Sequence, residues 1–223
     1  MLSSNTYNER EMYVMNTAIK RLPQKEPTSA NIHPHKGFIT REGRNEALGH
    51  ESGVVWLTGL SGAGKSTIAT MVERMLFQQG YTISILDGDT LRSGLNYDLD
   101  FSKEAREENL RRTGEVASLF ADSGHIVLAS FISPHHKGRE SVKSIVGENF
   151  HLVHIHADMD DCISRDPKGL YKKAMFGGIE NFTGIGQDYE IPESADLVIN
   201  TSNDSIAECT MKLAAFIKSN FAL

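Results

Sequence analysis

GLSGAGKS, at residues 59–66, matches the phosphate-binding loop pattern G-x-x-x-x-G-K-[ST] at every fixed position. Residues 54–58, VVWLT, come directly before it and form a short apolar run rich in β-branched side chains, as in a buried parallel strand. After the loop, Gly80 is placed as a C-cap for a run of apolar residues at helical spacing, namely Ile68, Met71, Val72, Met75 and Leu76. The order strand, glycine-rich loop, helix predicts a site for nucleotide phosphates.

Each residue type in this loop has a chemical reason. Glycines allow backbone N–H groups to turn toward phosphate oxygens, and the helix N-terminus adds a favourable partial charge. Lys65 is expected to reach the β- and γ-phosphates of ATP, and the Ser66 hydroxyl to hold Mg²⁺. The expected nucleotide-binding residues are Gly59, Leu60, Ser61, Gly62, Ala63, Gly64, Lys65, Ser66 and Thr67.

Further strands and helices alternate along the chain. Apolar runs predict strands at residues 83–86, 126–129, 152–156 and 197–200. Helices are predicted at residues 103–123, 137–146 and 160–165, and a final helix opens with a capping box at Ser205 and Glu208. The expected core residues of the two longest helices are Leu110, Val116, Ala117, Phe120, Ile206, Cys209, Leu213 and Ile217. Five parallel strands alternating with helices predict an α/β fold with a doubly wound sheet.

Polar residues follow two of these strands. Asp87 and Asp89 flank a glycine at the end of the second strand, where open α/β sheets bind ligands. Asp87 is expected to orient Mg²⁺ or its waters, and Asp89 to accept a proton from an attacking hydroxyl. Ser133 lies in the loop after the third strand and could bind or accept phosphate as a catalytic residue, although serine before proline is also an ordinary turn.

Residues 166–190 differ in composition from the rest of the chain, since they combine lysines with several glycines. Lys168, Lys172 and Lys173 can bring positive charge to phosphates. This segment is therefore predicted to be a mobile lid over the nucleotide, with a surface loop of solvated lysines as the alternative.

The composition excludes several classes of protein. A net charge of −6 does not favour nucleic-acid binding, and no apolar stretch approaches membrane-spanning length. Cys162 and Cys209 have no metal-ligand spacing, so reduced packing cysteines in a cytoplasmic protein are expected. No N-K-x-D sequence occurs, which argues against guanine-specific switch GTPases, and no Asp-Glu pair closes an apolar strand, which argues against ATPase motors. A small-molecule kinase remains.

The chain before the phosphate-binding loop carries weaker signals. Residues 1–30 are expected to be a flexible extension with some helix over residues 9–22. Residues 31–53 are expected to be a solvated lead-in to the domain. His33 and His35 could suggest a metal site, but no third ligand lies at useful spacing.

Several separate stretches together resemble adenylylsulfate kinases (APS kinases): VVWLTGLSGAGKST, LDGD, GLNYDL, REENLRR, SFISP, RDPKGLYKKA and NFTGI. The resemblance covers residues from about 31 to 201. It implies a kinase domain over residues 31–223 that uses ATP to phosphorylate the 3′-hydroxyl of adenosine 5′-phosphosulfate. It also suggests a homodimer and leaves open a contact with an ATP sulfurylase through the N-terminal extension.

The resemblance also implies a set of site residues. The sulfonucleotide site would comprise Asp89, Arg92, Phe101, Arg106, Asn109, Ile132, Ser133, Lys168 and Phe182, and Arg165 would lie near the adenine of ATP. Arginines suit the anionic phosphosulfate, and Phe101 and Phe182 could sandwich the acceptor adenine. The family often carries a phosphoserine at the position of Ser133, but direct in-line transfer is expected here because such kinases act by positioning and charge.

The chain departs from the family pattern at Thr90, Asp100, His136 and Gly138, none of which is an expected catalytic residue. Two other functions stay open at this point. One is a kinase acting on another nucleotide or nucleoside, and the other is a non-catalytic copy that binds nucleotide and regulates a partner. The intact Lys65, Ser66, Asp87 and Asp89 argue against the second.

Overall fold

The computed structural model describes residues 31–32, 37–179 and 182–223. The helix expected within residues 9–22 and the histidine pair His33 and His35 lie outside the described residues. Among the described residues, no helix combines the length and the apolarity that a bilayer crossing requires.

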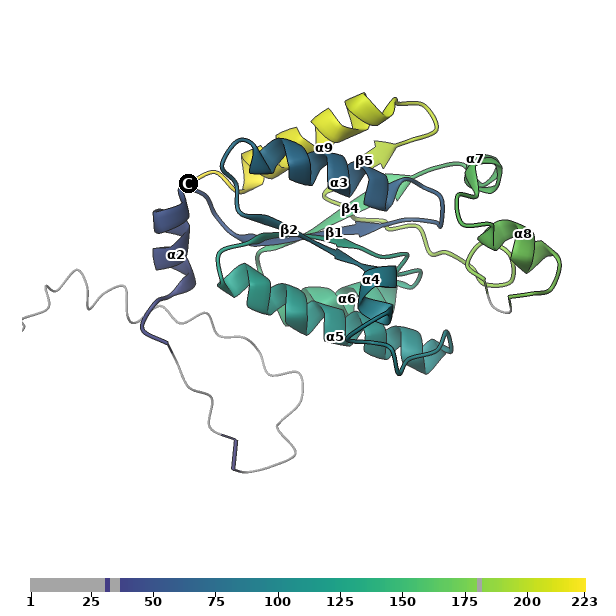
Figure 1. Cartoon of the computed structure of the whole chain (residues 1–223), viewed down its shortest axis with the longest axis horizontal. Helices are drawn as coiled ribbons and strands as arrows, with labels where there is room; N and C mark the ends of the chain where they lie inside the picture. The colour runs from purple at the N-terminus through teal and green to yellow at the C-terminus, as the bar shows by residue number, and fades with distance from the viewer. Residues whose placement is uncertain (1–30, 33–36, 180–181) are drawn as a thin grey trace, which may run out of the picture.

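A parallel sheet of five strands forms the centre of the molecule (Figure 1). The strands are β1 (Gly53–Thr58), β2 (Ile83–Asp87), β3 (Ile126–Ser130), β4 (Phe150–His156) and β5 (Leu197–Asn200). Their order across the sheet is β2-β3-β1-β4-β5, and every neighbouring pair is parallel. The predicted doubly wound α/β sheet is confirmed. Because β1 is central and buried along its whole length, the phosphate-binding loop emerges from the middle of the sheet.

Helices cover both faces of this sheet. One face carries α3 (Lys65–Phe77) and α9 (Ile206–Asn220), and the other carries α5 (Lys103–Asp122) and α6 (His136–Val146) (Figure 1). Alternate residues of β1 point to opposite faces, as the two-residue period of a strand requires. Val55 and Leu57 join the core beneath α3 and α9, whereas Val54 and Trp56 join the core beneath α5 and α6.

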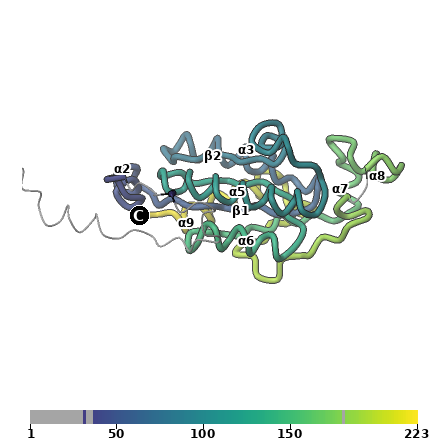
Figure 2. Tube along the Cα trace, turned by 90° about the horizontal axis from the view of Figure 1, so that it is seen from below, coloured from purple at the N-terminus to yellow at the C-terminus, as the bar shows by residue number. Residues whose placement is uncertain are grey.

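Shorter helices lie at the two ends of the sheet. The short helix α4 (Gly88–Arg92) directly follows β2. In Figure 2, α7 (Met159–Arg165) and α8 (Leu170–Met175) lie at one end of the molecule and α2 (Arg41–Leu48) at the other. The end that carries α7 and α8 is the one at which the parallel strands end, so it is where ligands are expected.

The prediction of a solvated lead-in over residues 31–53 is wrong for its second half. Thr40 caps α2 by accepting a hydrogen bond from the Gly43 amide at 3.2 Å. The buried Arg41 donates from Nε to Ser52 Oγ at 2.8 Å, and the His50 ring accepts from the Thr82 amide at 3.0 Å. Polar hydrogen bonds rather than apolar periodicity attach this segment, so the sequence pattern did not reveal it.

Most of the apolar residues at helical spacing and most of the expected core residues are buried, Met75 and Val116 are partly buried, and three are exposed. Ile68, Val72, Leu76, Leu110, Ala117, Cys209, Leu213 and Ile217 are buried. Met71, Phe120 and Ile206 are 44%, 38% and 57% exposed, respectively. Met71 lies at the edge of the buried face of α3, and Phe120 lies near the C-terminal end of α5. Ile206 is the first residue of α9 and faces a cavity at the end of the sheet.

Candidate active site

A cavity of about 1280 Å³ opens at the end of the sheet where the parallel strands end. It is lined by the phosphate-binding loop, the acidic pair after β2, the loop after β3 and the lid segment, which we define as residues 166–190. Every predicted sulfonucleotide residue lines this cavity, namely Asp89, Arg92, Phe101, Arg106, Asn109, Ile132, Ser133, Lys168 and Phe182. Gly59, Leu60 and Ala63 do not line it, in contrast to the other predicted nucleotide-binding residues.

Two glycines shape the phosphate-binding loop. A Cβ on Gly59 would lie 2.3 Å from the Ile155 carbonyl oxygen, so no larger residue fits where β1 turns away from β4. Gly64 has a φ of +94° and is the N-cap of α3. This left-handed conformation favours glycine and aims the first amides of α3 into the cavity.

Lys65 is a buried cation in the loop, with an exposed fraction of 8%. Its Nζ donates to the carbonyl oxygens of Gly59 at 2.9 Å and Leu60 at 2.8 Å. Burial lowers the pKa of Lys65 to about 8, because removal from water disfavours the charged form. An anion arriving in the cavity would meet a poorly solvated ammonium group, which is the condition for a strong interaction with phosphate.

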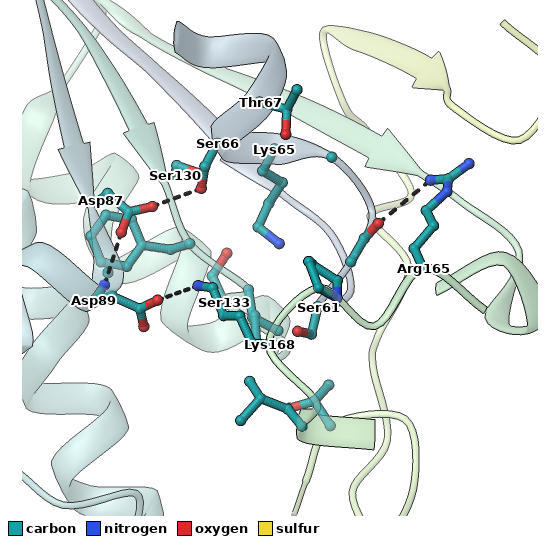
Figure 3. A pocket seen from close by; sticks show the side chains of 18 of the residues that line it. Ser61, Lys65, Ser66, Thr67, Asp87, Asp89, Ser130, Ser133, Arg165 and Lys168 are labelled. Carbon is teal, nitrogen blue, oxygen red and sulfur yellow. Dashed lines mark hydrogen bonds and ion pairs between the residues drawn. The ribbon is translucent and has the colours of Figure 1, made fainter. Parts of the chain in front are cut away.

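Three oxygen-bearing side chains meet beside the loop. Ser66 Oγ donates to Asp87 Oδ2 at 2.7 Å and lies 3.2 Å from Ser130 Oγ (Figure 3). Asp87 also accepts from the Asp89 amide at 3.0 Å, which caps α4. Sequence reasoning missed Ser130, although its position at the end of β3 beside the end of β2 could have indicated it.

Asp89 contacts the lid segment within the cavity. Lys168 Nζ forms an ion pair with Asp89 Oδ2 (Figure 3). Both side chains are more than half exposed, so this pair contributes little to stability. It does place one expected catalytic carboxylate and one lid lysine at the same point of the cavity.

The opposite part of the cavity combines cations with an exposed aromatic ring. The Arg92 guanidinium lies 4.4 Å from the centre of the Phe101 ring, and that of Arg106 lies 5.7 Å from it. Phe101 is 64% exposed, so its ring is open to a planar ligand. Asn109 is buried and accepts a hydrogen bond from Asn96 at 3.0 Å. A planar, anionic molecule suits this surface.

The lid segment is more structured than its composition indicates. The helix α8 was not predicted, because its glycine N-cap and its lysines hide the helical pattern. Tyr171 is 1% exposed, and its hydroxyl donates to the Ser61 carbonyl at 3.0 Å. Phe182 is also buried and packs edge-on against Tyr171, with ring centres 5.0 Å apart. Phe182 therefore belongs partly to the core and is not simply an exposed partner of Phe101.

At one end of the cavity, the sequence predicted Arg165 as a site residue but not its neighbours. Arg165 donates to Thr201 Oγ1 at 3.0 Å and to the Thr201 carbonyl at 2.7 Å. Asp204, Ser205, Ile206 and Cys209 line the cavity at the start of α9. The capping box, which the structure confirms, could have indicated this end because it places a helix start just after the fifth strand.

Metal-ligating side chains do not gather elsewhere in the part of the chain that is described. No group of three or more His, Cys, Asp or Glu residues there could hold a metal ion. Cys162 and Cys209 are free and buried, as predicted for packing residues.

Ser133 has an unusual backbone and an engaged hydroxyl. Its φ is +39°, which is rare outside glycine, and its exposed fraction is 3%. Its Oγ accepts from Trp56 Nε1 at 3.1 Å and donates to Thr58 Oγ1 at 2.9 Å. A buried hydroxyl whose proton is already donated is poorly placed to attack a phosphoryl group.

Ser133→Ala is therefore expected to lower activity only severalfold, with no phosphoenzyme on the main path. Loss of these hydrogen bonds costs about 1 kcal/mol each, mainly in positioning. The measurement is rapid acid quenching with γ-labelled ATP, and the exposed Ser144→Ala is the control for unspecific labelling. A phosphoserine at residue 133 that forms and decays as fast as turnover would contradict this expectation.

The family model and the curated relatives agree on one family. The family described as Adenylylsulphate kinase matches residues 51–200. An adenylyl-sulfate kinase of Bacillus velezensis is 47% identical over 196 residues, covering 87% of this chain and 100% of that protein. A solved structure of a Mycobacterium tuberculosis APS kinase with AMPPNP and APS is 44% identical, with a TM-score of 0.72, covering 75% of this chain and 98% of that one. A Sinorhizobium meliloti gluconokinase, 16% identical with a TM-score of 0.52 and covering 75% and 93% of the two chains, shares the fold alone.

Proposed function

The chain belongs to the adenylylsulfate kinase family, and we propose that it transfers the γ-phosphoryl group of ATP to the 3′-hydroxyl of adenosine 5′-phosphosulfate. The product is 3′-phosphoadenosine 5′-phosphosulfate, an activated sulfate donor. The observation that carries the proposal is a single cavity with a phosphate-binding loop on one side and an arginine-flanked aromatic ring on the other. Such a cavity can hold a phosphoryl donor and an anionic nucleotide acceptor at the same time.

ATP occupies the side of the cavity formed by the loop. The loop amides and Lys65 bind its phosphates, and Arg165 lies beside its adenine together with Thr201 and the start of α9. Phosphoryl transfer needs positive charge more than covalent chemistry, since its transition state spreads charge over the equatorial oxygens. Lys65 supplies that charge.

Mg²⁺ is the metal that fits the oxygen donors beside the loop. Ser66, Asp87 and Ser130 offer two hydroxyls and one carboxylate, which suits an ion that keeps several waters and binds substrate phosphates. When bound, Mg²⁺ would neutralise charge on the transferring phosphoryl group. The sparse donor set agrees with a metal that arrives together with ATP.

The adenosine phosphosulfate acceptor occupies the side with Phe101. Arg92 and Arg106 pair with its phosphosulfate, and Phe101 stacks on its adenine. Asn109, Ile132, Ser133 and Phe182 line the remaining contact surface. Asp89 accepts a hydrogen bond or the proton from the 3′-hydroxyl, and Lys168 neutralises the charge around it.

The test of this function is a coupled assay of ATP turnover with four acceptors: adenosine 5′-phosphosulfate, AMP, adenosine and a pyrimidine nucleotide. Of the four acceptors, we expect only adenosine 5′-phosphosulfate to support ATP turnover. A chelator should abolish this turnover, and added Mg²⁺ should restore it. Faster turnover with another acceptor would favour the alternative nucleotide kinase. No turnover with any acceptor, combined with ATP binding, would favour a regulatory copy.

The lid segment is expected to be mobile without acceptor and ordered with it. If the lid closes only when the acceptor is bound, the γ-phosphoryl group of ATP is protected from transfer to water. Phe182→Leu should raise the acceptor KM and the ratio of ATP hydrolysis to transfer, because a smaller side chain loses the ring contact near the acceptor. The measurement is hydrogen exchange over residues 166–190 with and without adenosine 5′-phosphosulfate, alongside both kinetic quantities.

Phe221→Leu is the matched control for this change, because Phe221 is 1% exposed in the same core cluster and does not line the cavity. It should lower stability without changing the ratio of hydrolysis to transfer. Unchanged exchange on acceptor binding, together with unaltered kinetics in Phe182→Leu, would mean that residues 166–190 do not close on the acceptor.

The resemblance also supports a proposal on assembly and location. We propose a homodimer in the cytoplasm, with the kinase domain over residues 31–223 and residues 1–30 as an extension able to contact an ATP sulfurylase. Sedimentation analysis of the full chain, alone and with an ATP sulfurylase, measures both associations.

A further inference from the structure

Arg139 is a buried cation outside the cavity lining. It lies on α6 and is 2% exposed. Its Nη1 donates to the Ser133 carbonyl at 2.8 Å and its Nη2 to the Glu190 carbonyl at 2.9 Å. Within residues 37–179 and 182–223 its guanidinium forms no ion pair with a carboxylate, and its Nε has no hydrogen-bond partner. Burial consequently lowers the pKa of Arg139.

A buried charge is costly unless hydrogen bonds or ion pairs compensate its lost hydration, and the Arg139 guanidinium relies on two main-chain carbonyls. The two carbonyls belong to different parts of the cavity wall. Ser133 lies in the acceptor loop, residues 130–134, whereas Glu190 lies in the lid stem, which we define as residues 187–191. Arg139 therefore joins the loop that lines the acceptor side to the segment through which the lid returns to the sheet.

Other contacts join the same two segments. The Glu190 amide donates to the Pro134 carbonyl at 2.9 Å, and its carboxylate accepts from the His136 amide at 2.5 Å. The Tyr189 hydroxyl lies 3.0 Å from Thr58 Oγ1, which in turn accepts from Ser133 Oγ at 2.9 Å. Thr58 is the last residue of β1 before the phosphate-binding loop. The network thus touches the acceptor loop, the lid stem and the donor side.

The backbone of Ser133 explains why this network is needed. A φ of +39° in a non-glycine residue persists only where the surroundings hold it. The Arg139 hydrogen bond restrains the Ser133 carbonyl, and Thr58 and Trp56 restrain its side chain. Release of the carbonyl would let the acceptor loop relax away from its place in the cavity.

We propose that Arg139 is a positioning residue for the acceptor, which holds the acceptor loop and the lid stem in one arrangement and is supported by Tyr189. This inference rests on the proposed function, because it concerns the acceptor side of that site. Arg139 does not line the cavity, so it acts through Ser133 and the lid stem and not by touching substrate.

Arg139→Met tests the proposal, since methionine fills space without donating hydrogen bonds. We expect the KM for adenosine 5′-phosphosulfate to rise about tenfold, while the KM for ATP stays within about twofold, because the two lost hydrogen bonds hold the acceptor loop and the lid stem and neither involves the phosphate-binding loop. Arg139→Lys keeps one donor group and should give an intermediate acceptor KM. Tyr189→Phe removes one hydroxyl and should raise the acceptor KM about threefold.

Arg41→Met is the matched control. Arg41 is also a buried arginine that donates to a main-chain carbonyl, but it lies in α2 at the far end of the molecule. Arg41→Met should lower Tm and leave the ratio of the acceptor KM to the ATP KM unchanged. Equal rises of both KM values in Arg139→Met, or an acceptor KM within twofold of the wild type, would overturn the proposal. If Arg139→Met does not fold, unchanged acceptor KM values in Arg139→Lys and Tyr189→Phe overturn it instead.

Hydrogen exchange without substrate separates this proposal from the function on which it rests. Faster exchange over residues 130–134 and 187–191 in Arg139→Met, but not in Arg41→Met, supports the network whatever the acceptor is. Unchanged exchange there overturns it. Failure of the wild type to phosphorylate adenosine 5′-phosphosulfate would instead overturn the proposed function and leave the exchange result valid.

Discussion

Lys65→Ala is expected to abolish phosphoryl transfer and to leave the fold in place. The Lys65 ammonium group is buried beside the loop amides and is the cation placed to meet the transferring phosphoryl group. A preorganised charge of this kind contributes several kcal/mol to the transition state, so the turnover number should fall by about 10³ or more. The fold should survive, because the lost contacts are two hydrogen bonds to loop carbonyls. Turnover and Tm measured on the same preparation test both halves of this expectation.

The pH dependence of kcat/KM for ATP is a second test of the role of Lys65. Burial lowers its pKa to about 8, so the charged form is lost from the free enzyme as pH rises through that value. We expect kcat/KM for ATP to fall above pH about 8 in the wild type, since this ratio reports the free enzyme. Lys65→Arg should not show that fall, because a guanidinium stays protonated.

The same shift predicts a change in stability. Between pH about 8 and 10.5, unfolded Lys65 holds a proton that folded Lys65 has lost. The free energy of unfolding of the wild type should therefore rise with pH in this window, relative to that of Lys65→Ala.

Near-normal turnover in a folded Lys65→Ala protein would contradict the assignment of the loop as the ATP phosphate site.

Asp89→Asn is expected to lose most turnover while nucleotide binding is retained. Asparagine keeps the shape of the side chain but cannot accept the proton of the 3′-hydroxyl, and loss of such a base costs about 10²–10⁴ in rate. Asp89 is mostly exposed, and its partner in the structure is Lys168, so the substitution should not unfold the protein. The measurements are the turnover number and the Kd for ATP with Mg²⁺.

Asp87→Asn and Lys168→Met are the controls that separate the roles in this pair. Asp87 accepts from Ser66 and caps α4, so Asp87→Asn should mainly raise the Mg²⁺ concentration needed for activity. Lys168→Met removes the ion pair but leaves the Asp89 carboxylate, and its loss of turnover should be smaller than that of Asp89→Asn. A larger loss of turnover in Asp87→Asn than in Asp89→Asn at saturating Mg²⁺ would reverse the two assignments.

The five strands and the phosphate-binding loop could be predicted because their signals are local. Apolar β-branched runs mark strands buried on both faces, and the spacing of glycine, lysine and serine within eight residues defines the loop. Parallel strand ends meet at one edge of a sheet, so Asp87, Asp89 and Ser133 could be assigned to one site before any distance was known. The structure brings all three to the same cavity.

The acceptor side depended on the family resemblance as well as on local pattern. Arg106 and Asn109 lie on a charged helix on which Arg111 and Arg112 form surface ion pairs with Glu108. Helical spacing places Arg106 and Asn109 on the same face as the buried Leu110 and Thr113, but the spacing does not show that this face reaches a cavity. Only the packing of α5 against the sheet turns Arg106 and Asn109 into the cavity.

The sequence by itself determined the strands, the loop chemistry and the edge of the sheet that carries the site, because each of these follows from neighbouring residues. Only the tertiary structure decided the anchoring of α8 through Tyr171, the enclosure of Ser133 by Trp56 and Thr58, and the link from Arg139 to Glu190. These contacts join residues that lie 51 to 110 positions apart. Their geometry depends on how helices and loops pack after burial, and an isolated polar residue carries no periodic signal of the carbonyl or hydroxyl that it will meet.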